Sequence, residues 1–262
     1  MGRCLKNNRP NHSAMAGVLV WLLMVAAQAG DAAGESSEPR WLVEAPTAGM
    51  MPTGRMAIDV RAASGRSILA DVELGLWNRV LVGVSFGGQN LLGSGSSEWN
   101  PDPGVSGRLR LLNESPTRPA LAVGFRSQGS GVYDDVLKRY HAKSLGIYAV
   151  FSRNYWHPTG QGGVHFGLNR SLEDGDGDDT LTGFVGGDLE FWGRVAAVGE
   201  YHFALNDDAG LALGQGRGYM NLGIRWFVTA GVFVEFDLKD VFENNNRADK
   251  PVREVRVVFL RE

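Results

Sequence analysis

The stretch SILADVELGLWNRVLVGVSFG, residues 67–87, decides the fold of this 262-residue chain. Apolar residues alternate with polar or small residues on both sides of Asn78-Arg79, and this period of two places them on opposite faces of a β-strand. Before the dipeptide, for example, Val72 falls on one face while Asp71 and Glu73 fall on the other. The stretch therefore predicts a β-hairpin with one apolar face and one charged face.

The same unit recurs from about Gly54 to Leu260. Runs of roughly ten alternating residues are separated by turns, and a tilted strand needs ~9–11 residues to cross a bilayer. The pattern predicts an all-β protein with twelve strands, at residues 54–62, 67–77, 80–91, 105–112, 119–127, 145–154, 162–171, 181–191, 194–204, 218–228, 231–240 and 253–261.

The connections between these strands alternate in length, from brief turns to long loops. A soluble β-sandwich also alternates apolar and polar residues, but its connections lack this strict order. Short periplasmic turns, long external loops and an even strand count are typical of a transmembrane up-and-down antiparallel β-barrel of the bacterial outer membrane. The short connections are Asn78-Arg79, Asn113 to Arg118, Tyr155 to Gln161, Trp192-Gly193 and Thr229-Ala230.

The N-terminal residues indicate export. A basic start is followed by an almost entirely apolar run and by the small-x-small site Ala27-Gln28-Ala29, which together predict a signal peptide over residues 1–29. We expect residues 30–53 to form a loose periplasmic lead-in, followed by the outer-membrane barrel over residues 54–262. Cys4 lies in the predicted signal, so the mature chain has no cysteine and forms no disulfide.

The charge balance argues against a nucleic-acid partner. The whole chain has a formal net charge of −3, and residues 1–29 contain Arg3, Lys6 and Arg9 but no acidic residue. Cleavage therefore moves the net charge from −3 to −6, which disfavours binding to a phosphate backbone. No run of roughly 18 apolar residues follows the predicted signal, which excludes a helical membrane span.

Charged residues fall on the strand face that we assign to the barrel lumen. An arginine or lysine facing lipid at the bilayer midplane costs ~2–4 kcal/mol, so the inward assignment is favoured. Twelve strands enclose a narrow interior, which these side chains either nearly fill through ion pairs or leave as a thin polar path. The predicted lumen residues are Asp71, Glu73, Arg108, Arg110, Arg126, His165, Asp188, Glu190, Glu200, His202, Arg225, Glu235, Asp237, Glu254 and Arg256.

Four tryptophans support the orientation of the barrel. Trp77, Trp156, Trp192 and Trp226 all lie within a few residues of a short turn, so an up-and-down chain brings them to one rim. An indole ring combines an apolar body with a polar N–H and favours the interface between bilayer and water. We therefore predict that these four residues form an aromatic girdle at the periplasmic rim.

No motif for catalysis, cofactor binding or metal binding stands out, so we predict a non-enzymatic barrel without a cofactor. His165 and His202 lie in predicted strands and face the lumen. The stretches that follow them, up to Asn169 and Asn206, lack the serine that a barrel phospholipase needs beside its histidine. We interpret both histidines as members of a polar hydrogen-bonded network.

Two predicted external loops carry further features. Residues 173–179, with the sequence EDGDGDD, cluster carboxylates as a cation site does, but their spacing departs from that of an EF-hand. We expect an exposed, solvated acidic loop, and the alternative is loose binding of divalent cations near lipopolysaccharide. In the loop at residues 128–144, the stretch Tyr133 to Tyr140 is compatible with a short helix that either folds into the barrel or caps it.

A resemblance to a known family rests on five stretches, Glu44 to Gly49, Gly83 to Gly88, Ala122 to Gly129, Glu200 to Asp207 and Arg253 to Phe259. These stretches resemble the YjbH-like outer-membrane barrel proteins, and the resemblance covers nearly all of the mature chain. It implies a role in exopolysaccharide production and export, and it carries over no catalytic residue. One departure is the ending Leu260-Arg261-Glu262, because barrels of this kind usually end in an aromatic residue.

Several functions follow from these patterns. The leading hypothesis is a barrel that assists the passage or surface organisation of an exopolysaccharide, and the main alternative is a passive small-solute channel. A lipid-modifying enzyme that uses His165 and His202 is less favoured. A further alternative is a structural or adhesive barrel whose lumen is plugged. The expected partners are outer-membrane lipid, lipopolysaccharide and the barrel-insertion machinery, with polysaccharide as a further partner under the leading hypothesis.

Overall fold

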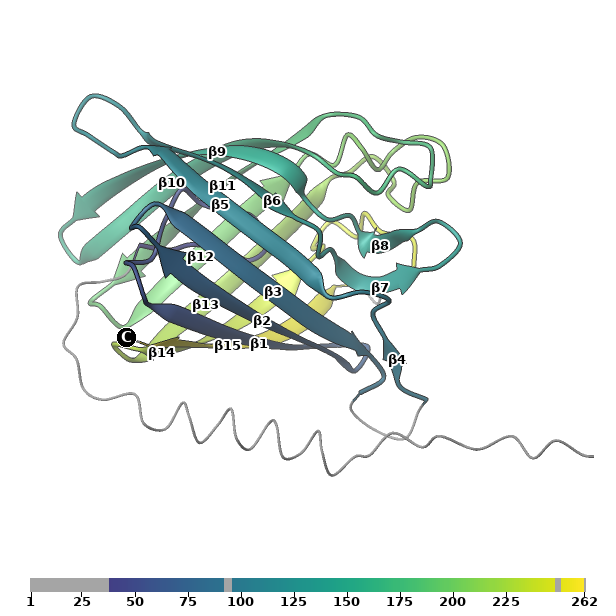
Figure 1. The fold of residues 1–262 in the computed structure, drawn as a ribbon, viewed down its shortest axis with the longest axis horizontal. Helices are drawn as coiled ribbons and strands as arrows, with labels where there is room; N and C mark the ends of the chain where they lie inside the picture. The colour runs from purple at the N-terminus through teal and green to yellow at the C-terminus, as the bar shows by residue number, and fades with distance from the viewer. Residues whose placement is uncertain (1–37, 92–95, 248–250, 262) are drawn as a thin grey trace, which may run out of the picture.

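The computed structural model describes residues 38–91, 96–247 and 251–261, which form a closed antiparallel β-barrel (Figure 1). Within these ranges, no helix has the length and apolar character needed to cross a bilayer. The predicted signal peptide, residues 1–29, lies outside the described part of the chain.

Twelve strands make the ring, and each pairs with the strands before and after it. The first strand of the ring also pairs with the last, from Met56 opposite Arg261 to Ala63 opposite Glu254, which closes the barrel. The strands of the ring are β1 (Met56–Ala63), β2 (Ser67–Leu76), β3 (Val80–Gln89), β5 (Gly104–Leu112), β6 (Ala120–Arg126), β9 (Gly146–His157), β10 (Gly160–Arg170), β11 (Thr182–Phe191), β12 (Val195–His202), β13 (Tyr219–Thr229), β14 (Val232–Lys239) and β15 (Val252–Arg261).

All twelve predicted strands are confirmed, and their bounds differ from the prediction by a few residues. The largest difference concerns the predicted turn from Tyr155 to Gln161, most of which is strand, because His157 pairs with Gly160 across a two-residue turn. Other short turns have positive φ at both central residues, with 50° at Trp77 and 55° at Asn78. Such mirror-image turns match the right-handed twist of the flanking strands.

The two faces of the barrel wall differ in polarity as expected. On β3, Val82, Val84 and Phe86 are exposed on the outside, whereas Leu81 and Ser85 are buried inside. The other strands repeat this pattern, with exposed apolar side chains outside and mostly polar or charged ones inside. An apolar outer belt around a closed barrel with a charged interior is the architecture of bacterial outer-membrane barrels, and this chain is one of them.

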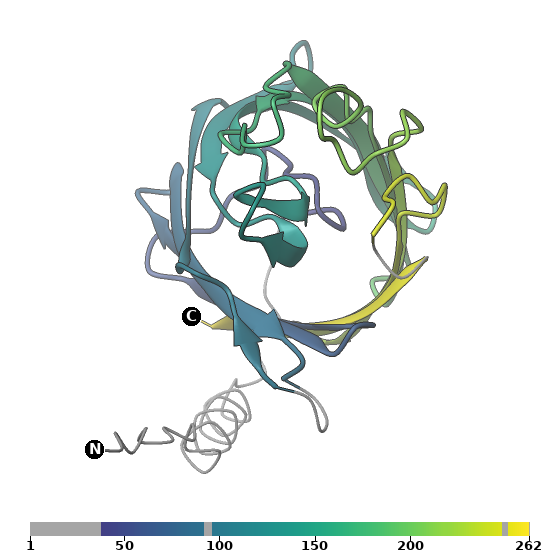
Figure 2. The same cartoon turned by 90° about the vertical axis from the view of Figure 1, so that its right-hand side faces the viewer.

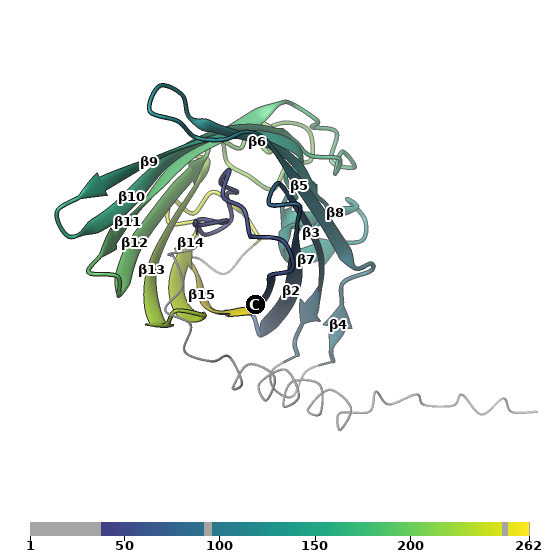
Figure 3. The ribbon, with the colours of Figure 1, turned by 60° about the vertical axis from the view of Figure 1, so that its left-hand side comes forward.

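The chain before the first strand enters the barrel. Residues 38–51, the internal segment, run through the ring and turn back inside it (Figure 3). Leu42, Val43 and Ala45 are all 0% exposed. The prediction that residues 30–53 form a loose periplasmic lead-in is therefore wrong for residues 38–51. These residues lie inside the barrel, because the barrel wall supplies the hydrogen-bond partners that they lack on their own.

The external loops cover part of the opposite mouth of the barrel. A hairpin of β7 (Ser130–Asp134) and β8 (Arg139–Ala142) projects across the ring when it is viewed from that end (Figure 2). The short helix considered for Tyr133 to Tyr140 is therefore wrong, because Tyr133 pairs with Tyr140 across the hairpin and their rings make an edge contact at 5.0 Å. A further short strand, β4 (Glu98–Trp99), extends the edge of β3 outside the ring.

Candidate functional site

The internal segment makes a tight turn inside the lumen. The backbone N–H of Leu42 donates to the carbonyl oxygen of Ala45 at 2.9 Å, and that of Thr47 donates to Arg40 at 3.0 Å. These two bonds satisfy only part of the buried backbone, and buried peptide groups need partners. The remaining groups must be satisfied by the barrel wall.

Four wall arginines donate to carbonyl oxygens of the segment, and one of them, Arg110, donates from Nε to Ala48 at 2.9 Å. Arg108 Nη1 donates to Arg40 at 2.9 Å and to Gly49 at 3.1 Å. Arg225 Nη2 reaches the carbonyl of Trp41 and Arg256 Nη1 that of Leu42, both at 3.1 Å. Because these arginines come from β5, β13 and β15, the segment is held from several sides of the ring.

One wall carboxylate accepts from the opposite edge of the segment. Glu200 on β12 accepts the backbone N–H groups of Val43, Glu44 and Ala45 at 2.8 to 3.0 Å. The same carboxylate also accepts from Asn221 Nδ2 at 2.7 Å and is 2% exposed. Charge-assisted bonds of this kind contribute more than neutral ones, so Glu200 is a strong anchor of the segment.

Trp41 anchors the segment on the other side of the lumen. Its ring lies 4.6 Å from the guanidinium carbons of both Arg108 and Arg126, and its indole N–H donates to Glu73 at 3.0 Å. Arg40 forms a salt bridge with the same Glu73. A cation–π contact of this kind is stabilising where water is excluded, and Trp41 is 4% exposed.

Several wall charges also pair with one another, whereas both carboxylate oxygens of Asp237 are buried without a hydrogen-bond partner among the described atoms. Arg256 binds Asp59 at 2.7 Å, and Arg126 binds Asp71 at 2.9 Å. Arg225 pairs with Glu235, which also lies 3.4 Å from Arg256. The lumen of the described structure is thus filled by ion pairs and by the internal segment rather than left as an open path.

The structure places the fifteen predicted lumen residues on the inner side of the wall. Most are fully buried, and Arg110, Asp188, Glu190 and His202 are half-buried. Those in direct contact with the internal segment, through a hydrogen bond, salt bridge or ring, are Glu73, Arg108, Arg110, Arg126, Glu200, Arg225 and Arg256.

Sequence reasoning missed several residues of the lumen. Asp59 and Arg61 on β1 are 7% and 3% exposed, and Lys239 on β14 is 7% exposed. These residues alternate with apolar neighbours along their strands, and this alternation predicts that they face the lumen. The apolar patch of β6 and β9 that packs against the segment, which includes Ala122, Tyr148 and Val150, has no such signal.

The four predicted girdle tryptophans all lie toward the end of the barrel that carries the short turns. Trp77 and Trp192 stand in three-residue turns, Trp156 is next to the end of β9, and Trp226 pairs with Val195 at the start of β12. Their side chains are between 53% and 85% exposed on the outer surface. This placement suits an interface between lipid and water.

The structure brings a serine to His165, which its own strand lacks. Ser152 on β9 is the cross-strand partner of His165, and its Oγ lies 2.8 Å from Nδ1. His165 Nε2 lies 3.0 Å from Asp188 Oδ1 on the next strand. The backbone N–H of Ala48 donates to Ser152 Oγ at 2.7 Å, which leaves the hydroxyl hydrogen available to Nδ1 in the tautomer whose Nε2–H donates to Asp188.

This trio resembles the residue set of a serine hydrolase, but its surroundings give it another role. The Ser152 side chain is buried against the internal segment, and the adjacent cavity measures about 10 Å³. A nucleophile needs space for a reacting carbonyl and donors for its oxyanion. Ser152 instead holds the backbone of the segment, and His165 with Asp188 orients its hydroxyl.

We expect Ser152→Ala to destabilise the barrel by roughly 1–3 kcal/mol, because Ala48 N–H and His165 Nδ1 both lose a buried partner. Urea unfolding of the detergent-solubilised barrel measures this change. Ser106→Ala, at a half-buried strand position, is the control and should change the free energy of unfolding by less. Equal effects of both substitutions would argue against an anchoring role for Ser152.

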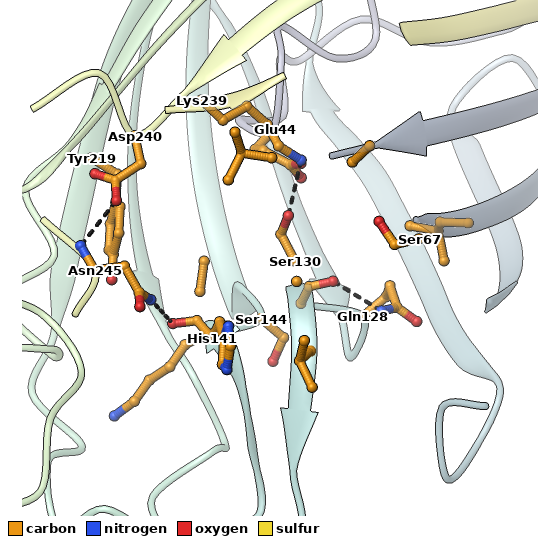
Figure 4. Close-up of a pocket in the computed structure, with 18 of the residues that line it drawn as sticks. Glu44, Ser67, Gln128, Ser130, His141, Ser144, Tyr219, Lys239, Asp240 and Asn245 are labelled. Carbon is orange, nitrogen blue, oxygen red and sulfur yellow. Dashed lines mark hydrogen bonds and ion pairs between the residues drawn. The ribbon is translucent and has the colours of Figure 1, made fainter. Parts of the chain in front are cut away.

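A cavity of about 350 Å³ opens at the external end of the barrel, on the external side of the internal segment (Figure 4). Its walls are rich in amide and hydroxyl side chains, among them Gln128, Ser130 and Asn245. Lys239 Nζ donates to Glu44 at 2.8 Å, to Glu254 at 2.7 Å and to Ser130 at 2.9 Å. The carboxylate of Glu44, which belongs to the internal segment, therefore forms part of the cavity lining.

The acidic loop at residues 173–179 differs from the exposed loop that we expected. Asp176 and Asp178 are 2% and 3% exposed. Asp176 binds Arg139 at 2.5 Å and Lys143 at 2.8 Å, and Asp178 accepts backbone N–H groups of the next external loop. Among the described residues, no group of three or more potential ligands is placed to hold a metal ion. Arg139 on β8 and Lys143 just after it bind Asp176, where the alternative interpretation placed a divalent cation.

The hairpin that covers the mouth should loosen in acid. Burial, together with Arg247 and Arg139, lowers the pKa of His141, so the folded hairpin favours the neutral imidazole. This contribution is complete above the unfolded pKa of about 6.5 and is lost as pH falls below it. Glu173, whose pKa burial raises, acts in the opposite sense.

We therefore expect amide hydrogen exchange of β7 and β8, corrected for intrinsic rates, to be faster at pH 5 than at pH 7 in the unmodified chain. The variant His141→Asn should show a smaller difference between the two pH values. Identical pH dependence in both proteins would assign the effect to groups other than His141.

The comparisons with known proteins concern the fold. No family model and no curated protein matches the chain. Among solved structures, the KdgM porin matches with a TM-score of 0.47 and 10% identity, over 79% of this chain and 98% of that one. An outer-membrane channel from Pseudomonas putida F1 matches with a TM-score of 0.45 and 12% identity, over 80% and 97%. The Salmonella typhi outer-membrane phospholipase matches with a TM-score of 0.39 and 12% identity, over 87% and 95%.

Proposed function

We propose that this outer-membrane barrel is a non-enzymatic channel for small polar solutes, and that the internal segment keeps it closed. The observation that carries the proposal is the way the segment is held. Glu200, Arg108, Arg225 and Arg256 bind its backbone through hydrogen bonds, and in the described structure its one covalent link to the wall is the chain that leads into β1. Water can replace such bonds when the segment moves.

The wall is suited to a hydrated path once the segment leaves. The salt bridges of Arg126 with Asp71, and of Arg256 with Asp59, join wall strands to one another, and both arginines also contact the segment. A lumen lined by charges of both signs stays wet, whereas an apolar constriction would lose its water. The external cavity then becomes the outer vestibule of this path.

Planar-bilayer recordings of the purified chain test the proposal. The unmodified barrel should be closed for most of the time, and Glu200→Gln should open more often, because a neutral amide accepts the three backbone N–H groups more weakly. Glu190→Gln is the matched control, since Glu190 lies near a short turn and bonds only Gln161 among the described contacts. Absence of ion current from all three inserted proteins would contradict a channel.

Our second proposal is the exopolysaccharide role implied by the resemblance to YjbH-like proteins. The amide and hydroxyl groups around the external cavity support it, since they match the hydrogen-bonding needs of sugar hydroxyls. Deleting the gene from its host and measuring secreted polysaccharide tests this role. Unchanged secretion would leave the channel as the remaining proposal.

A further inference from the structure

We propose that the carboxylate of Glu44 occupies a built-in binding site for small carboxylate solutes, which compete with it from the external cavity. The inference rests on the proposed channel function and names the class of solute that opens it. Glu44 is the part of the internal segment that reaches furthest toward the cavity, and its side chain is 25% exposed. In this respect it acts as a ligand that the chain itself supplies.

Two buried cations form the site. Lys239 Nζ lies 2.8 Å from Glu44 Oε1, and Arg61 Nη1 lies 3.3 Å from the same oxygen. Their side chains are only 8% and 3% exposed, so they are held in place and cannot follow a departing carboxylate into water. Figure 4 shows Glu44 and Lys239 facing one another at the edge of the cavity.

Both cations lose a carboxylate partner when Glu44 leaves. Lys239 then keeps Glu254 at 2.7 Å, and Arg61 keeps Asp59 at 3.2 Å, a carboxylate that Arg256 also binds. The carboxylate of Glu254, which lies 4.0 Å from Arg61, is then shared by the two cations. Burying uncompensated charge is costly, so departure of Glu44 is favoured only when another anion replaces it.

The cavity gives a replacing anion both access and hydrogen bonds. A volume of about 350 Å³ is at the lower end of small-molecule sites, which span roughly 300–1,000 Å³. Ser130 Oγ is 2.9 Å from Lys239 Nζ, and the Gln128 side chain lines the same space. Arg126 Nη1 is buried there without a hydrogen-bond partner among the described atoms, and is a donor for a bound solute. These groups suit a carboxylate with a polar, hydroxylated body.

Calorimetric titration with sodium gluconate tests the site on the full, folded chain in detergent. Sorbitol is the matched probe, because it has the same carbon chain but a hydroxymethyl group in place of the carboxylate. Gluconate should bind the unmodified barrel, and Glu44→Gln should bind it roughly tenfold more tightly, since the tethered competitor has lost its charge. Sorbitol should show no such gain.

Two variants make the result specific. Glu38→Gln changes the other carboxylate at the far end of the same segment, which pairs with Arg110 and lies outside the cavity, and should leave gluconate affinity unchanged. Lys239→Gln, added to Glu44→Gln, should abolish the gain in gluconate affinity that Glu44→Gln alone produces. Heat-dependent gel mobility checks that the double variant is folded. Equal affinity of the unmodified, Glu44→Gln and Glu38→Gln proteins, or equal binding of sorbitol, would overturn the inference.

Planar-bilayer recordings separate this inference from the channel proposal. External gluconate should raise the open probability of the unmodified barrel, and Glu44→Gln should be open more often without it. If Glu44→Gln conducts but gluconate neither binds nor opens the unmodified barrel, the channel stands and the carboxylate site falls. If gluconate binds as expected while no variant conducts, the site stands and the channel proposal falls.

Discussion

Deletion of residues 38–51 is expected to convert a barrel that is closed for most of the time into one that conducts steadily. The internal segment fills the lumen with side chains that are almost fully buried, including Trp41 at 4% and Leu42 at 0% exposure. The deletion removes this material and replaces it with water. The measurement is single-channel current across planar bilayers from purified, refolded protein.

The barrel should remain folded after this deletion, because its closure does not depend on the segment. The strands pair around the full ring, and β1 pairs with β15 through backbone hydrogen bonds. Glu73 and Glu200 lose partners in the segment, but both carboxylates then face water that fills the lumen. Unpaired charges in a hydrated lumen cost far less than unpaired charges in a dry interior.

A second variant protects this prediction against failure of insertion. Replacing Trp41, Leu42 and Val43 together by serine keeps the length of the segment but removes its cation–π contact and its apolar packing against β6, β9, β11 and β12. This variant should also conduct more than the unmodified protein. Currents no larger than those of the unmodified barrel, from folded protein of both variants, would contradict a closing role for the segment.

Arg139→Met is expected to destabilise the external loops by ~3–5 kcal/mol, the usual cost of removing one partner from a buried ion pair. The Arg139 side chain is 0% exposed, and its Nη1 lies 2.5 Å from Asp176 and 2.6 Å from Asp207. These carboxylates come from two different loops, so Arg139 ties the β7–β8 hairpin to both. Methionine has similar length but leaves both carboxylates without this cation.

Hydrogen exchange of the hairpin and of residues 171–181 measures the loss. Lys138→Met is the matched control, because Lys138 is adjacent in sequence, its side chain is 68% exposed and it forms only a long surface pair with Asp135 at 3.9 Å. Exposed pairs contribute about 0–1 kcal/mol, so this control should leave exchange nearly unchanged. Similar exchange in the two variants would show that the buried network does not hold the loops.

The wall of the barrel could be predicted from the sequence because each strand carries its own evidence. In residues 67–87 the period of two, the short turn and the strand lengths all agree, and the neighbouring strands repeat them. Lumen charges such as Glu73 and Arg256 follow from the same period. Asp59 and Arg61 obey it as well, and were missed although the signal was present.

The internal segment could not be predicted in the same way. Its residues show no strand period, and its partners are far away in the sequence: Ala45 and Glu200 are 155 positions apart. The Ser152, His165 and Asp188 trio likewise depends on the register of three adjacent strands. The sequence alone does not distinguish a helix from a hairpin at Tyr133 to Tyr140. The hairpin is held by Arg139, which binds Asp176 and Asp207 in loops that are distant in sequence.

The reactivity of a single thiol in the internal segment tests the central claim, that residues 38–51 fill the lumen, most directly. Ala45 is 0% exposed and Thr53, just beyond the segment, is exposed, so Ala45→Cys and Thr53→Cys are compared in a Cys4→Ser background. In the folded, membrane-inserted barrel, we predict that a water-soluble maleimide modifies position 53 rapidly and position 45 only slowly, until urea unfolds the protein. Equally rapid modification of both positions in the folded barrel would contradict a filled lumen.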